Sequence, residues 1–463
     1  MKLSDYRDEL IKYDLPSFIG KALGTCDPGA VYLPNWHINL IAEYLEAARR
    51  GQIRRLIINM PPRSLKSVCV SVAWPAWLLA HDPKSRVIAA SYASSLAVKH
   101  SLDSRAVITS PWYKRLFPDV MLARDQNEKH KFMTSERGFR FATSVGGALT
   151  GEGGNFLIID DPVSPMHAMN KHWRGHVNRW FDSTFASRLD DKKNGVIVLV
   201  MQRLHAQDLT GHLLDKGGWE HLSLPAVAMR NEIHKVGIAY HERAVGELLH
   251  PDRENAELIA RAKMELGSQA FAAQYQQQPL PEEGGMVRAQ WLGRYKMAPV
   301  HERCVQSWDT AIKSGRQHDA SVCLTFAEFE GRSYLLDACV LRQEYPDLKR
   351  SVYSLAARWK PDAILVEDRA SGQQLLQDIK REAHLPLIPV SPKHDKVTRF
   401  AAISAMIEAG RLVLPERAAW LADFESELFS FPHGAHDDQV DALSQYLDWL
   451  RASVWQRLSL RRI

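Results

Sequence analysis

The chain has 463 residues, of which 45% are apolar and 24% charged, and its net charge is +5. These proportions are ordinary for a globular protein of two or three domains, and no repeat or low-complexity tract is present. The N-terminus, MKLSDYRDE, is too charged for a signal peptide, and no apolar run is long enough to span a bilayer. We therefore expect an intracellular protein without a membrane partner. The mild positive charge permits a polyanionic partner without requiring one.

Residues 31–50 are expected to form a helix that Asn35 caps and Gly51 ends. Trp36 and His37 stand near its start, before the first strand. A flat aromatic ring and a hydrogen-bonding ring at this place are candidates for contacts with a nucleotide base. Core packing is the alternative role for Trp36.

Residues 55–67 have the layout of a phosphate-binding loop, because an apolar run stops at two prolines and a basic turn then opens a helical segment. The candidate nucleotide ligands of this turn are Arg63, Ser64, Lys66 and Ser67. In such loops the lysine contacts the β- and γ-phosphates, and the serine hydroxyl helps to hold Mg²⁺. Met60 and Leu65 replace the usual glycines. On this stretch alone, a solvated basic turn stays an alternative.

A helix is expected from Ser67 to Trp74, where Pro75 would break it, and Arg86–Tyr92 is expected to be a second buried strand. A strand, a helix and a strand within so short a stretch predict a βαβ unit and a parallel sheet.

The run Asn155–Pro162 predicts a buried strand that delivers two carboxylates to the carboxyl edge of that sheet. Asp160 is the candidate Mg²⁺ ligand, and Asp161 is the candidate base that orients or deprotonates the attacking water. The alternative is that Asp160 and Asp161 only form the turn that ends the strand, and the phosphate-loop layout around Lys66 argues against it.

Two further features lie near this predicted edge. Residues 144–154 hold five glycines and form a flexible loop or a long turn. The strand Gly195–Met201 ends in polar residues that sense the γ-phosphate or simply cap the strand; they are Gln202, Arg203 and His205.

The pattern weakens over residues 231–300, where a polar helix at 255–278 leads into Pro279, Pro281 and two glycines. We expect a connecting segment there. It would separate an ATPase domain at 1–230 from a second domain at 301–463.

The second domain is predicted to begin with three strands in an antiparallel meander, followed by a helix, a strand and a terminal helix. The first strand ends in Asp309, the fourth ends in Glu367, and the last helix opens with Asp437, Asp438 and Asp441. This order of elements and acids is the ribonuclease H-like plan. Carboxylates that converge from remote positions suit two Mg²⁺ ions in phosphodiester cleavage, with Mn²⁺ as a possible substitute.

Each acid also has an ordinary structural alternative, as a turn former, a solvated strand end or a favourable charge at a helix start. Three basic residues between the acids are candidates for phosphate contacts or for a solvated helix start; they are Lys393, Lys396 and Arg399.

Taken together, the chain resembles the large terminase subunit of tailed bacteriophages over nearly its whole length. The resemblance rests on Trp36-His37, Met60–Ser67, Leu157–Pro162, Ser307–Ala311, Val366–Gly372 and His436–Ala442. It implies an N-terminal P-loop-type ATPase with a parallel sheet, which translocates double-stranded DNA, and a C-terminal ribonuclease H-like mixed α/β nuclease, which cuts concatemers.

The resemblance also implies ATP and Mg²⁺ as cofactors, with Lys66, Ser67 and Asp160 at the phosphates and metal and Asp161 as base. It assigns Asp309, Glu367 and Asp438 to the nuclease metals. It further implies a pentameric ring on the capsid portal protein, a small terminase subunit as partner, and the cytoplasm of an infected bacterial host as location.

The sequence departs from the family pattern at two places. Asp161 replaces a glutamate that is common in related motors, and Glu152 stands where many relatives carry an arginine that acts across the subunit boundary. Arg137 and Arg140 are the candidate substitutes.

Three other readings stay open from the sequence. One is a helicase-type nucleic-acid ATPase whose C-terminal domain only binds DNA. Another is a transposase or recombinase that uses the acid triad for strand transfer. The third is a structural prophage protein with decayed sites.

Overall fold

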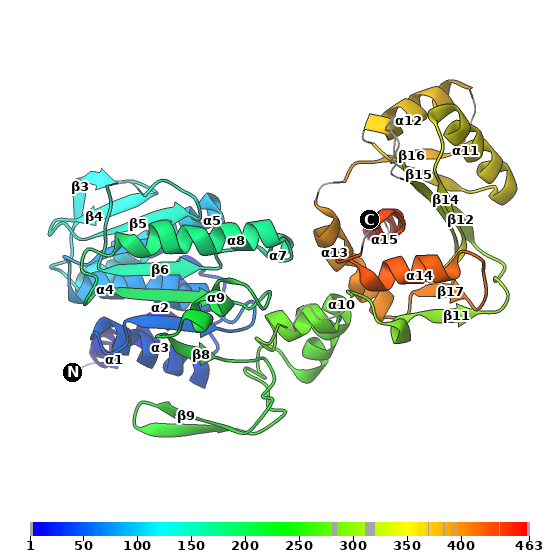
Figure 1. The fold of residues 1–463 in the computed structure, drawn as a ribbon. Coiled ribbons are helices and arrows are strands. Elements are labelled where there is room, and N and C mark those ends of the chain that lie inside the picture. The colour runs from blue at the N-terminus through cyan, green and yellow to red at the C-terminus, as the bar shows by residue number, and fades with distance from the viewer. Residues whose placement is uncertain are drawn as a thin grey trace. The chain divides into compact units, whose positions relative to one another are not determined.

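The computed structural model describes residues 3–149, 151–279, 285–310, 320–368, 370–382, 385–392, 394–434 and 436–460. It divides the chain into two compact units, which Figure 1 shows in sequence colours. Unit 1 comprises Met1–Lys263 and Ser268–Pro281, and unit 2 comprises Met264–Gly267 and Glu282–Ile463. Among the described helices, none combines the length and apolarity that a membrane crossing requires. The expected fold class, α/β with a ribonuclease H-like second half, is confirmed.

The helices before the boundary are α1 (Leu3–Tyr13), α2 (Leu15–Cys26), α3 (Trp36–Arg49), η1 (Val68–Ala73), α4 (Trp74–His81), α5 (Ser94–Thr109), α6 (Pro111–Leu116), α7 (Pro165–Ala168), α8 (Lys171–Trp180), η2 (Phe181–Phe185), η3 (Ala186–Arg188), α9 (Leu209–Lys216) and α10 (Ala256–Gln274). The strands of unit 1 are β1 (Arg55–Asn59), β2 (Arg86–Ser91), β3 (Leu122–Asn127), β4 (Lys131–Thr134), β5 (Phe139–Ser144), β6 (Phe156–Asp160), β7 (Val196–Met201), β8 (Glu220–Ser223), β9 (Glu232–Val236) and β10 (Ala239–Arg243).

Unit 1 is built on a sheet of order β3-β4-β5-β2-β6-β7-β1-β8. The strands from β5 to β8 in this order pair in parallel, whereas β3, β4 and β5 pair antiparallel. Successive side chains of β7 enter two different apolar clusters, one on each face of the sheet. Strands buried on both faces need continuous apolar sequence, which is why these runs could be predicted from the sequence.

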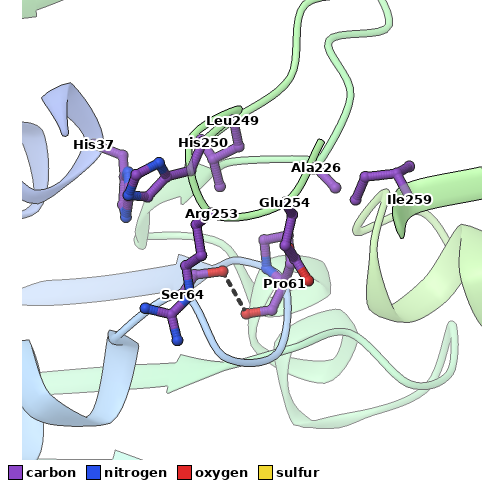
Figure 2. A pocket seen from close by; sticks show the side chains of 9 residues that line it. All are labelled: His37, Pro61, Ser64, Ala226, Leu249, His250, Arg253, Glu254 and Ile259. Atoms are coloured by element: carbon purple, nitrogen blue, oxygen red, sulfur yellow. Dashed lines mark hydrogen bonds between the residues drawn. The ribbon is translucent and has the colours of Figure 1, made fainter. Parts of the chain in front are cut away.

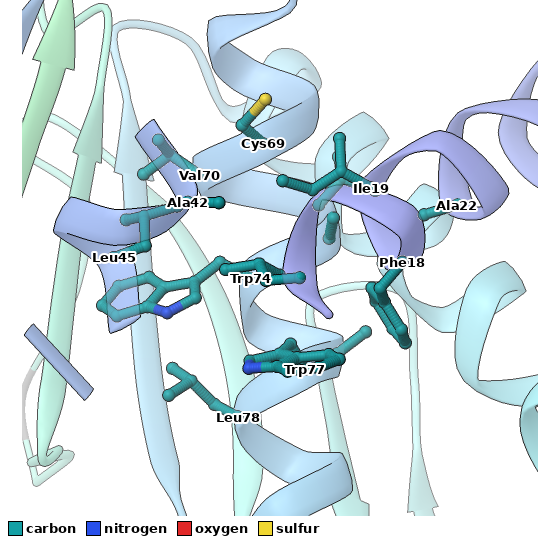
Figure 3. Packing of buried hydrophobic residues seen from close by; sticks show 14 of the residues in the cluster. Phe18, Ile19, Ala22, Ala42, Leu45, Cys69, Val70, Trp74, Trp77 and Leu78 are labelled. Carbon is teal, nitrogen blue, oxygen red and sulfur yellow. The ribbon is translucent and has the colours of Figure 1, made fainter. Parts of the chain in front are cut away.

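One face of this sheet is covered by α2, α3, η1 and α4, whose aromatic and aliphatic side chains interlock in Figure 3. Phe18 of α2 contacts the ring of Trp77 of α4 edge-on, with 5.1 Å between the centroids. The helix expected to break at Pro75 instead continues, because η1 leads into α4 and Pro75 lies in the first turn of α4. The missing N–H of a proline costs nothing at that position.

Residues 231–300, expected as a connecting segment, contain regular structure. The hairpin of β9 and β10 pairs antiparallel, and α10 turns at Gly267, whose φ is 78°. The division between the two units after α10 falls at residues 281 and 282. Pro281 and Gly284 of the expected linker lie outside the described residues.

Unit 2 contains η4 (Ala289–Trp291), β11 (Gly293–Tyr295), β12 (Arg303–Asp309), β13 (Ser321–Phe329), β14 (Arg332–Leu341), α11 (Tyr345–Trp359), β15 (Ala363–Glu367), α12 (Ala370–Glu382), β16 (Leu387–Val390), α13 (Lys396–Glu408), β17 (Leu412–Pro415), α14 (Leu421–Ser430) and α15 (Asp438–Leu460). The expected meander β12-β13-β14 is present and antiparallel. The full sheet has the order β11-β17-β14-β13-β12-β15-β16, and β15 joins β12 in parallel. Apolar clusters cover both faces, one built with α13 to α15 and the other with α11 and α12.

Candidate nucleotide and nuclease sites

The loop after β1 and the end of β6 meet at one edge of the sheet in unit 1. Lys66 Nζ lies 3.2 Å from Asp161 Oδ2, and Ser67 Oγ donates a hydrogen bond of 3.0 Å to Asp160 Oδ1. Lys66 and Asp160 are buried, so both the ion pair and the hydroxyl contact act in a medium of reduced dielectric. The sequence-predicted pair of phosphate loop and acidic strand end is therefore one cluster.

Burial raises the pKa of both acids, and Lys66 acts in the opposite direction on each. On the far side of Asp160, His100 Nδ1 lies 3.4 Å from Oδ2, and burial lowers the pKa of this histidine to about 4. Arg140 is fully buried nearby and donates to the Ser71 carbonyl oxygen at 3.0 Å. Burial lowers the Arg140 pKa to about 9, and Asp160 works against that shift.

A fully buried arginine cannot reach a neighbouring subunit, so the suggestion that Arg140 acts across a subunit boundary is wrong. Arg137 remains available for that role, with 73% of its side chain exposed. Glu152, which replaces the family arginine, forms an ion pair of 2.7 Å with Lys131 and thereby anchors the glycine-rich loop.

The phosphate loop holds two non-glycine residues in the left-handed region of backbone space. Arg63 and Leu65 both have φ of 63°, and Asp161 beyond β6 has φ of 45°. A left-handed conformation costs an L-residue about 1–2 kcal/mol. The loop thus keeps the backbone shape for which glycine is normally used, and Ser64 stabilises it by donating to the Pro61 carbonyl oxygen at 3.0 Å.

The end of β7 contacts the same edge. The Gln202 backbone N–H donates to Asp161 Oδ1 at 3.3 Å, which gives this strand end a direct link to the acid. Arg203 is instead buried in an ion pair with Asp208 at 3.0 Å, and its backbone N–H donates to Gln277 Oε1.

A narrow pocket with a cavity volume of about 10 Å³, room for about one water molecule, lies beside the phosphate loop (Figure 2). It is lined by His37, Pro61, Ser64, Ala226, Leu249, His250, Arg253, Glu254 and Ile259. The rings of His37 and His250 lie next to each other, with 5.6 Å between their centroids. The sequence-predicted His37 therefore lies in a pocket adjoining Ser64.

Hydrogen bonds fix the tautomers of these two histidines. The Asn35 side-chain amide donates to His37 Nδ1 and to the Leu249 carbonyl oxygen, so it makes no capping bond to α3. His37 is 1% exposed, and burial lowers its pKa to about 3, so the ring is neutral and carries its proton on Nε2. The Ser64 backbone near the ring opposes that shift, but Nε2 has no partner in hydrogen-bonding geometry.

His250 Nε2 lies 3.3 Å from the Leu33 carbonyl oxygen, which only accepts, so the neutral ring has its acceptor at Nδ1. That buried Nδ1 also has no hydrogen-bond partner. The pocket thus has one unused donor and one unused acceptor.

Trp36 lies outside the lining of this pocket. Its ring stacks with His241 of β10 at 4.1 Å between centroids and with His234 of β9 at 5.2 Å. Trp36 therefore joins α3 to the β9–β10 hairpin.

In unit 2, strand register brings the first two acids together. Trp308 of β12 pairs with Val366 of β15 in parallel, so Asp309 and Glu367 end neighbouring strands on the same face. The start of α15 packs over β12, because Ser307 Oγ donates to the Ala442 carbonyl oxygen at 2.8 Å. The three sequence-predicted sources of acid therefore meet at one place.

The mutual repulsion of these acids is visible in Asp309. Burial raises its pKa to about 8, with further contributions from Asp441, Glu367 and Asp438. Nearby cations offset this negative charge. Lys396 Nζ lies 2.7 Å from Asp437 and 2.6 Å from Asp441.

Arg399 adds a second cation to Asp441, at 2.8 Å. Two of the three predicted basic residues thus bind acids of the cluster, and Lys393 lies outside the described residues. Carboxylate oxygens suit a divalent cation in kind. In the described part of the chain, however, no three His, Cys, Asp or Glu side chains are arranged to hold a metal ion.

Residues 306–448 match the model of the terminase RNaseH-like domain family. The match covers about a third of the chain. No curated protein sequence matches the chain significantly. The resemblance to large terminase subunits that the motifs predicted is confirmed by this domain together with the solved structures that share the fold.

The large terminase of a thermophilic bacteriophage is similar in its complex with ADP, at 9% identity over 87% of this chain and 98% of that chain, with a TM-score of 0.50. In the complex of the same terminase with ATP-γ-S the identity is 10% over 88% and 98%, with a TM-score of 0.50. The HK97 bacteriophage large terminase is 11% identical over 94% and 99%, with a TM-score of 0.39. At such identities the likeness to the first two structures shows the fold alone.

Sequence reasoning missed several residues around the terminase-like sites. His100 and His250 come from segments remote from any motif, and Arg140 was expected in another role; only the tertiary fold brings them to Asp160 and His37. Asp208 was also missed, although an acid shortly after a polar strand end could have suggested a partner for Arg203.

Proposed function

We propose that unit 1 binds and hydrolyses ATP. The observation that carries this proposal is the double contact of Lys66 with Asp161 and of Ser67 with Asp160. In the nucleotide complex, Lys66 turns to the β- and γ-phosphates, and the carboxylate of Asp161 becomes free to orient the attacking water. The exposed Arg63 adds a further cation at the mouth of the loop.

Ser67 and Asp160 fit the magnesium ion that accompanies ATP. Both offer oxygen atoms at one place, and Asp160 Oδ2 is buried, with His100 Nδ1 at 3.4 Å but outside good hydrogen-bonding geometry. The ion would neutralise phosphate charge there.

Lys66→Ala tests the ATPase site. We expect at least a hundredfold loss of ATP hydrolysis, since each 1.4 kcal/mol of lost stabilisation is about tenfold in rate. Asp161→Asn should retain binding of a fluorescent ADP analogue while turnover falls. Lys192→Ala, in an exposed turn far along the chain, is the matched control. Full hydrolysis by Lys66→Ala would refute the site.

We further propose that the pocket beside the loop widens to receive the nucleotide base, because its cavity of about 10 Å³ has room for only about one water molecule. Adenine offers a ring-nitrogen acceptor next to an amino donor. His37 Nε2–H and His250 Nδ1 offer the complementary donor and acceptor, and both are otherwise unpartnered. Trp36 contributes indirectly, through the position of α3.

A binding cycle tests this contact. ATP and the triphosphate of purine riboside, which lacks the amino group, are compared on wild type and His250→Ala. A hydrogen bond lost in a buried site costs about 1–3 kcal/mol, so we expect ATP to bind roughly tenfold more weakly to the variant than to wild type. The analogue should lose little. Equal losses of affinity for ATP and for the analogue would show that His250 does not contact the amino group.

We propose that unit 2 is a divalent-metal-dependent DNA endonuclease, with Asp309, Glu367 and Asp438 as ligands for Mg²⁺ or Mn²⁺. Support comes from the meeting of these acids at one place and from the family of the domain. The resemblance to large terminases favours Asp438, and Lys396 and Arg399 both engage Asp441. Asp437, which also forms an ion pair with Lys396, is a second candidate for this metal ligand.

Linearisation of supercoiled plasmid with Mg²⁺ or Mn²⁺ tests the nuclease. We expect Glu367→Ala to abolish cleavage, and Glu416→Ala, an exposed acid of the same unit, to leave it intact. Equal cleavage by wild type and Glu367→Ala would refute the assignment.

At the level of the whole protein, we propose a large terminase subunit that drives double-stranded viral DNA into a procapsid and cuts concatemers. Its partners would be the portal protein, a small terminase subunit and further copies of the chain in a pentameric ring. Its place would be the cytoplasm of an infected bacterial host.

A second candidate is a helicase-type ATPase whose C-terminal domain only binds DNA. The arrangement of the acids favours it in one respect, because no three of the described side chains are placed to hold a metal. It predicts ATPase activity without cleavage under Mg²⁺ or Mn²⁺.

A further inference from the structure

The segment that follows the acidic end of β6 is basic and free of acids. Between Asp161 and Asp182 the sequence has no Asp or Glu, although it contains Lys, Arg and His throughout. This segment forms α7 and α8, and in Figure 1 α8 lies in front of strands β5 and β6. A basic helix therefore follows the acids of the nucleotide edge along the chain.

The charge gathers on the solvent side of α8. Its buried side consists of Arg174, Val177 and Trp180. The opposite side carries Lys171, His172, His176 and Arg179, of which His176 is half-buried and the others are exposed. We call these four residues the α8 basic face.

A glycine stands at the centre of the α8 basic face. Lys171, Gly175 and Arg179 are spaced four residues apart, so they form one line about 12 Å long. A Cβ at Gly175 would lie only 3.1 Å from Arg179 Nη1, so the guanidinium lies over the glycine. Glycine inside a helix costs about 0.5–1 kcal/mol, and here it leaves room for the Arg179 guanidinium to lie against the helix.

Lys171 and Arg179, the Lys and Arg of the α8 basic face, do not neutralise acids within the described part of the chain. Among the described residues, neither Lys171 nor Arg179 forms an ion pair, whereas the nearest following acid, Asp182, is engaged by His212 and Lys216. Trp173 adds an aromatic ring that is 43% exposed and stacks on His167 at 4.6 Å.

We propose that the α8 basic face binds the phosphate backbone of double-stranded DNA. Lys171 and Arg179, two unpaired cations about 12 Å apart on one helix face, can each contact a phosphate of a backbone whose charges follow about every 3.4 Å of helix axis on each strand. Contacts of this kind fix the position of a protein on DNA without reading its sequence. The inference rests on the proposed ATP-driven translocation, and it places a DNA contact directly after the acids that handle ATP.

The test compares two double variants of the full chain. Lys171→Ala/Arg179→Ala removes two cations of the face, and Lys192→Ala/Lys193→Ala removes two exposed cations from the turn before β7. Binding to a short labelled duplex is measured in EDTA, where cleavage is suppressed, over a series of salt concentrations. Each phosphate contact contributes about 0.9 to the slope of log K against log salt, so the first variant should flatten the slope by about two units. The control should keep the wild-type slope.

ATP hydrolysis separates this inference from the proposed function. The α8 variant should hydrolyse ATP like wild type without DNA and lose stimulation by DNA. Equal salt slopes in both double variants would overturn the inference while leaving the ATPase proposal intact. A loss of basal hydrolysis together with an unchanged slope would also overturn it, because the helix would then act only structurally. If wild type hydrolyses no ATP, the proposed function fails, and the salt slopes still decide whether the face binds DNA.

Discussion

His37 gives the stability of unit 1 a dependence on pH. Its ring is 1% exposed, and burial lowers its pKa to about 3, whereas an unfolded histidine titrates near 6.5. Between these values the unfolded chain binds a proton that the folded chain does not, so stability falls as the pH drops below about 6.5. At pH 5 the loss from this residue is about 2 kcal/mol.

Urea unfolding at pH 7 and pH 5 measures that loss. The wild type should lose more stability over this interval than His37→Gln, by about 2 kcal/mol. His100 and His221, whose pKa values burial lowers to about 4, should contribute in the same direction in both proteins. An identical pH dependence of wild type and variant would mean that His37 protonates in the folded state.

Leu65 tests the strain of the phosphate loop. At φ of 63° alanine is disfavoured and glycine is not, so Leu65→Gly should be more stable than Leu65→Ala by roughly 1 kcal/mol. In a helix the order would be the reverse. Denaturant midpoints of the two variants are the measurement, and both lose the same packing of Leu65 against the core. A more stable alanine variant would show that the loop adopts another backbone shape.

At the scale of elements, the β9–β10 hairpin depends on one ring. Trp36 stacks with His234 and His241, and the hairpin ends at Arg243, shortly before Leu249 of the pocket. Trp36→Ala should speed amide hydrogen exchange over residues 232–243, while the affinity for an ADP analogue changes less than in His37→Ala. If Trp36→Ala instead weakens nucleotide binding first, the ring contacts the base as the sequence suggested.

The elements that could be predicted from the sequence were those whose burial shows directly as a continuous run of apolar residues. Strands such as β6 and β7 are buried on both faces and appear as uninterrupted apolar runs. The β9–β10 hairpin could not be predicted, because its outer face is exposed and its strands alternate weakly. The helix end predicted at Pro75 was wrong, because the sequence alone does not distinguish a proline in the first turn of a helix from one that ends a helix.

The residues of the two sites also differ in whether the sequence predicts them. Carboxylates at strand ends could be placed together from the sequence, since parallel strands end at one edge of a sheet. The partners of those acids could not. Arg140, near the start of β5, interacts with Asp160 through its charge, and Lys396 reaches Asp441 from another helix, so only the packed fold joins them.

At the scale of the whole molecule, the two sites share no residue and lie in different units. We therefore expect their activities to separate. Lys66→Ala should lose ATP hydrolysis and still linearise plasmid, while Glu367→Ala should lose cleavage and still hydrolyse ATP. Both assays are run on the same preparations without procapsids, so that each variant serves as the folding control of the other. Loss of cleavage as well as ATP hydrolysis in Lys66→Ala would mean that nucleotide state governs cleavage, because removal of Lys66 then acts on acids of the other unit.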